Sequence, residues 1–283
     1  MAGKLNRWDF LEMKRESRQC VLVAAYDFPT ASFAEKAGMD MILVGDSLGM
    51  VLLGYSSTVP VTMEECLIHC RAVRRGAPST WCIGDMPFMS YQVSAEQAVE
   101  NAGRFIKEAG MDSVKLEGGA RAARQIEAIR DAGILVMGHI GLTPQSSAAL
   151  GGFKVQARDA AGARAVIDDA LAVEKAGAFS VILEGVPQEV TAFIREKLQI
   201  PVYGIGAGPC DGQVQVVGDL LGFFEAFTPK FSKKYADLAK IEVRAFQEYI
   251  DDVRHRRYPA DEHAYHILKG EEEAFEKLFQ EYA

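Results

Sequence analysis

Met41-Ile-Leu-Val-Gly-Asp46 decides the fold, because its apolar run stops on an ionisable residue and the same pattern occurs four more times. The other segments are Thr80-Trp-Cys-Ile-Gly-Asp85, Ser113-Val-Lys-Leu-Glu117, Leu135-Val-Met-Gly-His139 and Ser180-Val-Ile-Leu-Glu184. Continuous apolar runs of this length are typical of parallel strands that are buried on both faces. Charges at the same end of each strand are costly unless those ends meet at one site, as they do in a (β/α)8 barrel. We therefore expect one barrel mouth to carry Asp46, Asp85, Glu117, His139 and Glu184.

Amphipathic segments rich in Ala, Glu, Lys and Arg precede several of these runs. They end in Ala-Gly at 35–38, 107–110, 131–133 and 174–177. Glycine at this position supplies the left-handed residue that closes a helix. The repeated order of helix, glycine, strand and polar end predicts βα units with a parallel sheet.

The expected elements follow from this repeat. We predict strands near 20–26, 40–45, 80–84, 113–116, 135–138, 180–183, 202–205 and 214–218. Helices are expected near 29–37, 63–75, 95–109, 121–132, 161–176, 187–198 and 235–254, and a helix at 8–17 should cover the barrel bottom. The prediction is α/β, a single (β/α)8 TIM barrel over residues 1–283 with an N-terminal capping helix. A doubly wound open sheet is the alternative, but its glycine fingerprint is missing after the first strand, where Ala25-Tyr-Asp-Phe-Pro stands.

Composition narrows the classes of partner. The chain has 283 residues, a net charge of −8 and a pI near 5.3, which argues against nucleic-acid binding. No apolar stretch approaches the ~18 residues of a membrane span, and the N-terminus lacks a signal-peptide core. We expect a cytoplasmic protein that binds neither membrane nor nucleic acid. Cys66, His69 and Cys70 share a helix face, but no second ligand pair for zinc lies nearby.

Four carboxylates that converge on one mouth repel each other, and a bound cation relieves the repulsion. Ligation by oxygen alone suits Mg2+ or a similar hard ion, which polarises a carbonyl as a Lewis acid. Glu184 follows Val-Ile-Leu and precedes Gly-Val-Pro. This apolar setting should raise the pKa of Glu184 and so suit it to act as a general base.

Three features have two readings each. Lys115 should point inward beside Glu117, either in a salt bridge or toward a substrate carboxylate or enolate. His139 either orients the substrate or is a core histidine. The glycine cluster at 204–208 forms either a phosphate site or a tight turn. The long loop at 140–160 is expected to be a binding loop or lid.

A series of motifs runs in order over roughly residues 13 to 263. It includes Val44-Gly-Asp-Ser-Leu-Gly-Met50, Gly84-Asp-Met-Pro-Phe88, Val114-Lys-Leu-Glu-Gly-Gly119, Gly138-His-Ile-Gly-Leu-Thr-Pro-Gln145, Gly151-Gly-Phe-Lys-Val-Gln156, Leu183-Glu-Gly-Val-Pro187 and Gly204-Ile-Gly-Ala-Gly208. In these motifs the chain resembles the ketopantoate hydroxymethyltransferase family. The resemblance implies a Mg2+-dependent (β/α)8 barrel that assembles as a homo-oligomer, with a homodecamer expected.

The resemblance also implies a reaction and roles for residues. A hydroxymethyl group would pass from 5,10-methylenetetrahydrofolate to 3-methyl-2-oxobutanoate through a Mg-stabilised enolate, in the first committed step of pantothenate synthesis. Glu184 would be the proton acceptor. The metal ligands would be Asp46, Asp85 and Glu117, and the substrate would be bound by Asp46, Ser47, Asp85, Lys115 and His139.

Some loop residues depart from the family pattern, among them Met89, Ala157 and Gly218. They leave two alternatives open. One is a folate-independent, Mg-dependent lyase or aldolase that acts on a related α-keto acid. The other is a non-catalytic barrel retained for assembly.

Overall fold

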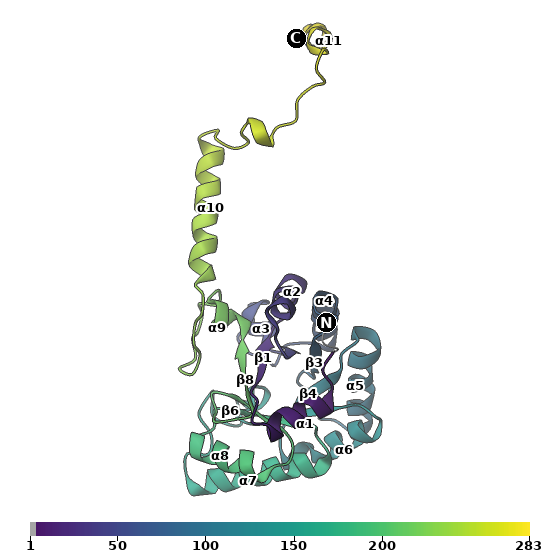
Figure 1. Cartoon of the computed structure of the whole chain (residues 1–283), viewed down its shortest axis with the longest axis vertical. Helices are drawn as coiled ribbons and strands as arrows, with labels where there is room; N and C mark the ends of the chain where they lie inside the picture. The colour runs from purple at the N-terminus through teal and green to yellow at the C-terminus, as the bar shows by residue number, and fades with distance from the viewer. Residues whose placement is uncertain (1–3) are drawn as a thin grey trace. The chain divides into compact units, whose positions relative to one another are not determined.

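The computed structural model describes residues 4–283. Eight parallel strands follow one another around a closed barrel, and the last pairs with the first (Figure 1). They are β1 (Cys20–Ala24), β2 (Met41–Val44), β3 (Trp81–Asp85), β4 (Ser113–Glu117), β5 (Val136–Gly141), β6 (Ser180–Glu184), β7 (Val202–Ile205) and β8 (Gly212–Val216). The predicted (β/α)8 barrel is confirmed.

Helices α2 and α4 to α8 surround the barrel (Figure 1). Their bounds are α2 (Phe28–Ala37), α4 (Met63–Gly76), α5 (Ala95–Ala109), α6 (Ala123–Asp131), α7 (Ala160–Ala176) and α8 (Gln188–Lys197). Short helices α3 (Leu48–Val51) and α9 (Val217–Leu221) follow β2 and β8. Gly38, Gly110 and Gly177 adopt the left-handed conformation that ends a helix, as predicted.

Helix α1 (Arg7–Arg15) covers the bottom of the barrel, as expected for a capping helix. Its start is fixed by a capping box between Asn6 and Asp9. Its buried residues Phe10 and Met13 join the lower interior of the barrel, where the ring of Phe10 meets that of Trp81 edge-on at 5.4 Å. This packing closes the end of the barrel opposite the carboxylates.

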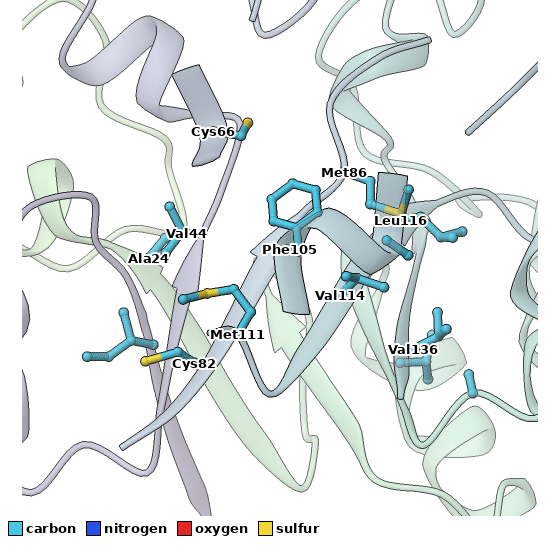
Figure 2. Close-up of a cluster of buried hydrophobic side chains, with 14 of the residues drawn as sticks. Ala24, Val44, Cys66, Cys82, Met86, Phe105, Met111, Val114, Leu116 and Val136 are labelled. Carbon is cyan, nitrogen blue, oxygen red and sulfur yellow. The ribbon is translucent and has the colours of Figure 1, made fainter. Parts of the chain in front are cut away.

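A second apolar core lies between the strands and the helices (Figure 2). Phe105 of α5 lies in this core near Val114 and Met86, and its ring rests on β3 at Gly84, where a Cβ would overlap it. Truncation of a buried phenylalanine to alanine typically costs about 3–5 kcal/mol of stability. The packing of α5 therefore holds the strand that ends at Asp85.

The described residues up to Ala236 form one compact unit, and Asp237–Ala283 forms another. The second unit contains α10 (Leu238–Arg254) and α11 (Glu272–Glu281), and none of the described residues in it is buried. The barrel accounts for the first unit, and the single catalytic domain over the whole chain stays a prediction. Among residues 4–283, no helix has the length and apolar character needed to cross a membrane.

Candidate active site

The five predicted strand-end residues lie together at the carboxyl end of the barrel. Asp46 follows β2, Asp85, Glu117 and Glu184 end their strands, and His139 lies within β5. All five line a cavity of about 100 Å³, together with Ser47 and Lys115. The strand register aligns Asp85 with Lys115 and Glu117 with His139. The sequence-based prediction of their common location is therefore correct.

Lys115 is the buried cation of this cavity. Its Nζ lies 2.9 Å from Asp85 Oδ1 and 3.7 Å from Glu117 Oε1, and 3.2 Å from His139 Nδ1. Burial disfavours the charged ammonium, but the nearby carboxylates outweigh it and raise the pKa of Lys115. Lys115 therefore points inward beside Glu117, as predicted, and forms a salt bridge with Asp85.

Asp46 and Asp85 are also linked directly, since the Asp46 N–H donates to Asp85 Oδ2 at 2.9 Å. Burial and the negative charges around them raise the pKa of both carboxyl groups. Burial acts in the same direction on Glu117, but the charges of Lys115 and His139 outweigh it and lower the pKa of Glu117. The cavity thus holds four carboxyl groups, of Asp46, Asp85, Glu117 and Glu184, against two cationic groups, of Lys115 and His139.

This charge imbalance fits a hard divalent cation, because the donors are carboxylate oxygens. Within residues 4–283, no group of three or more His, Cys, Asp or Glu side chains is arranged to hold a metal ion. Mg2+ does not need such a cage, since proteins usually hold it with one or two carboxylates while substrate oxygens and waters complete its shell. The donor chemistry of Asp46 and Asp85 is compatible with that mode.

Glu184 lies on the far side of His139 from Lys115. Its Oε2 is 3.1 Å from His139 Nε2. Burial and Lys115 lower the pKa of His139, but Glu117 and Glu184 more than compensate and raise it to about 9. The purely apolar setting expected around Glu184 is wrong, because its neighbour in space is an imidazolium brought in by β5.

Sequence reasoning missed the polar groups that hold these carboxylates. Gln145 donates from Nε2 to Asp46 Oδ2 and to the Met86 carbonyl, each at 2.9 Å, and its backbone N–H donates to Glu117 Oε2 at 3.0 Å. Tyr91 donates to Gln145 Oε1 at 2.8 Å. Gln145 lies within one of the motifs that resemble the family, and Tyr91 lies just after another. This position was the only indication of their importance in the sequence.

Ser47 is also held by a neighbouring side chain, since its Oγ lies 2.8 Å from the Tyr26 hydroxyl oxygen. Gly45 lets these groups approach, since a Cβ at Gly45 would come within 2.9 Å of Ser47 Oγ. The Thr58 hydroxyl also lines the cavity, and no described residue forms a hydrogen bond with its Oγ1. Nothing in the sequence indicated Thr58.

A second, larger cavity of about 570 Å³ adjoins the first and shares Ser47, Thr58 and Glu184 with it. Its aromatic walls come from Phe153, Phe224, Phe227 and Phe231. The predicted binding loop at 140–160 contributes Phe153 to this wall. We call it the outer cavity.

The glycine cluster after β7 bounds the outer cavity. Gly206 has a φ of +60°, and a Cβ there would approach within 2.5 Å of the Phe231 ring. The interpretation of the cluster as a tight turn thus has a structural reason. Glycine adopts the left-handed backbone conformation, and its lack of a Cβ leaves room for the Phe231 ring. The loop at 206–211 leads directly into β8.

Comparison with known proteins identifies the family of this chain. The model of the ketopantoate hydroxymethyltransferase family matches residues 4–261. A 3-methyl-2-oxobutanoate hydroxymethyltransferase of Alkaliphilus metalliredigens is 64% identical, with 100% of both chains covered. The enzyme of that name from Oleidesulfovibrio alaskensis is 51% identical over 93% of this chain and 91% of its own.

A solved 2,3-dimethylmalate lyase, described as a member of the PEP mutase/isocitrate lyase superfamily, superposes with a TM-score of 0.58. The superposition covers 100% of this chain and 99% of the lyase at 14% identity, so it concerns the fold alone. The family match and the close relatives are more specific. The chain therefore belongs to the ketopantoate hydroxymethyltransferase family of enzymes.

Proposed function

We propose that this enzyme transfers a hydroxymethyl group from 5,10-methylenetetrahydrofolate to 3-methyl-2-oxobutanoate and so forms 2-dehydropantoate (ketopantoate), the first committed step of pantothenate biosynthesis. The names of its close relatives support the reaction. The observation that carries the proposal is that Glu184 lines both cavities. One carboxylate can thus reach a keto acid in the first cavity while a one-carbon donor occupies the outer one.

The first cavity suits a small α-keto acid. In this proposal Asp46 and Asp85 hold Mg2+, and Glu117 lies in or next to its shell. The bound Mg2+ would polarise the keto group as a Lewis acid and make the C3 proton more acidic. Ser47, Lys115 and His139 orient the keto acid, together with Asp46 and Asp85. Lys115 also places a fixed positive charge where negative charge develops on the keto oxygen.

Glu184 is the proton acceptor. A general base must be held where it reaches the proton, and His139 Nε2 at 3.1 Å from Glu184 Oε2 fixes the direction of the Glu184 side chain. Glu184 removes the C3 proton, and the electron pair of that C–H bond enters the enolate. In this proposal His139 has a role at the site, which is one of its two readings from the sequence.

The enolate carbon then forms a bond to the methylene carbon of the donor. The two bonds from that carbon to the donor nitrogens are broken, and one water supplies the hydroxyl group. The remaining proton of the water and the proton held by Glu184 go to the two nitrogens, and tetrahydrofolate leaves. The atoms of this reaction balance with the keto acid, the donor and one water as the only reactants.

The test uses the protein in deuterated water with Mg2+ and 3-methyl-2-oxobutanoate, with and without the folate donor. NMR should show C3 exchange in both samples, and mass spectrometry should show ketopantoate only with the donor. Exchange without ketopantoate would mean that the donor is wrong. Cleavage or condensation of the keto acid in folate-free buffer would favour the lyase or aldolase, and no turnover of any kind would favour a non-catalytic barrel.

We infer that the protein works as a homo-oligomer, with ten subunits expected. The second unit supports association, because α10 exposes a row of apolar side chains that includes Ile241, Phe246 and Tyr249. Light scattering coupled to gel filtration measures the mass directly. A species at the mass of one 31.0 kDa chain would contradict the inference.

A further inference from the structure

Asp219 is a largely buried residue whose carboxylate has no partner among the described residues. It lies in α9 and lines the outer cavity, yet it is only 7% exposed. No residue among 4–283 forms a hydrogen bond or an ion pair with its carboxylate. Burial alone accounts for the rise of its pKa to about 6. A carboxylate that lines the cavity without a protein partner is free to accept hydrogen bonds from a bound ligand.

The surroundings of Asp219 define the shape and polarity of that ligand. The outer cavity is more than five times larger than the first cavity, at about 570 Å³ against about 100 Å³. Phe224, Phe227 and Phe231 supply aromatic surface for a flat ring. Two exposed cations, Lys154 and Lys230, line the same cavity and suit an anionic tail. The site therefore matches a planar heterocycle that bears adjacent N–H donors and ends in carboxylates.

We propose that the outer cavity binds the fused ring of the folate donor, and that the Asp219 carboxylate accepts hydrogen bonds from its 2-amino group and N3–H. Two adjacent donors match the two oxygens of one carboxylate, which gives both strength and orientation. This assignment rests on the proposed function, because it takes the one-carbon donor to be a folate. It places the methylene group toward Glu184, which both cavities share.

The experiment measures binding of tetrahydrofolate by calorimetry, without turnover, to the wild type and to Asp219→Asn. Loss of a charge-assisted pair of hydrogen bonds should weaken binding by about 10- to 100-fold. The KM for methylenetetrahydrofolate should rise by a similar factor, while the KM for 3-methyl-2-oxobutanoate should change less than twofold. Glu225→Gln is the matched control, because Glu225 is an exposed acid in the neighbouring segment.

A change of ligand tests the assignment on the unaltered protein. A 2-desamino analogue of tetrahydrofolate should bind the wild type about tenfold more weakly than tetrahydrofolate does. Asp219→Asn should bind the two compounds with equal affinity, because the partner of the amino group is already lost. Equal affinity of the wild type for both compounds would overturn the assignment, even if the variant failed to fold.

The failure of this inference differs from a failure of the proposed function. If the wild type exchanges the C3 proton but does not bind tetrahydrofolate, the proposed donor is wrong and the Asp219 assignment falls with it. If the wild type binds tetrahydrofolate and Asp219→Asn binds it equally well, only the Asp219 assignment is wrong. Phe227→Ala adds a second variant, which should weaken tetrahydrofolate binding by about tenfold through loss of the aromatic wall.

Discussion

Glu184 Oε2 lies 3.1 Å from His139 Nε2, and Glu184 lines both the first cavity and the outer cavity. The two residues come from adjacent strands β6 and β5, so the barrel itself fixes their separation. A histidine whose pKa is raised to about 9 carries a positive charge at neutral pH. The Glu184 side chain thus lines both cavities beside a cationic neighbour, and this position leads to the first prediction.

Glu184→Gln should abolish exchange of the C3 proton of 3-methyl-2-oxobutanoate. The amide preserves the shape of the side chain but cannot accept the proton, so the exchange rate should fall by about 100- to 10,000-fold. Keto-acid affinity, measured by calorimetry, should change little. Glu189→Gln in α8 is the control, since that carboxylate is exposed and should not affect exchange. A normal exchange rate in Glu184→Gln would remove Glu184 from the role of base.

Asp46→Asn should have opposite effects in the presence and absence of Mg2+. Without metal, the change removes one of the buried, mutually repelling carboxylates, so the unfolding temperature should rise by a few degrees. With Mg2+, the wild type should gain stability as the ion binds the folded state, whereas the variant should gain little. Differential scanning calorimetry with EDTA and with excess Mg2+ measures both effects. An equal gain from Mg2+ in the two proteins would exclude Asp46 as a ligand.

Gln145→Ala should weaken metal binding although Gln145 is not proposed as a ligand. Gln145 positions the carboxylates of Asp46 and Glu117 through two hydrogen bonds. The backbone bond to Glu117 should persist, but loss of the Asp46 partner should reduce metal affinity by about 10- to 100-fold. Titration with Mn2+ as a paramagnetic probe measures the affinity. Gln199→Ala, at an exposed position, should behave as the wild type.

The sequence was most informative where a local pattern determines the structure. The runs that end at Asp46 and Asp85 are apolar on both faces, because one face packs against the helices and the other lies inside the barrel. The same short segments therefore predicted both the strands and the site residues at their ends. Strand β8 was the hardest to locate, because Gln213 and Gln215 alternate with valines. The structure explains the alternation, since Gln215 donates to Ser232 Oγ and to the Lys233 carbonyl in the segment that follows the barrel.

Residues whose roles depend on long-range contacts could not be assigned from the sequence. Gln145 reaches Asp46 across 99 positions of the chain, and no local period marks such a contact. The setting of Glu184 was misjudged for the same reason, because its sequence neighbours are apolar while its spatial neighbour is His139. Nothing in the sequence singled out Asp219, and its place without a protein partner emerges only when α9 and the aromatic segments enclose the outer cavity.

Asp219 also predicts how stability depends on pH in the protein without ligands. Its pKa is about 6 in the folded state against 3.8 for an ordinary aspartate, so folding disfavours its charged form. Its contribution to stability is therefore most favourable below pH 3.8 and is lost as the pH rises through 6. Asp219→Asn, which carries no charge, should stabilise the fold at pH 7.5 by roughly 1–3 kcal/mol and by much less at pH 4.5. Urea unfolding at the two pH values measures the difference.

Tetrahydrofolate should make the wild type more stable than Asp219→Asn at pH 7.5, because it pairs with the carboxylate of the wild type but not with the amide. A variant that is equally stabilised at both pH values would show that the effect comes from packing rather than from the buried charge.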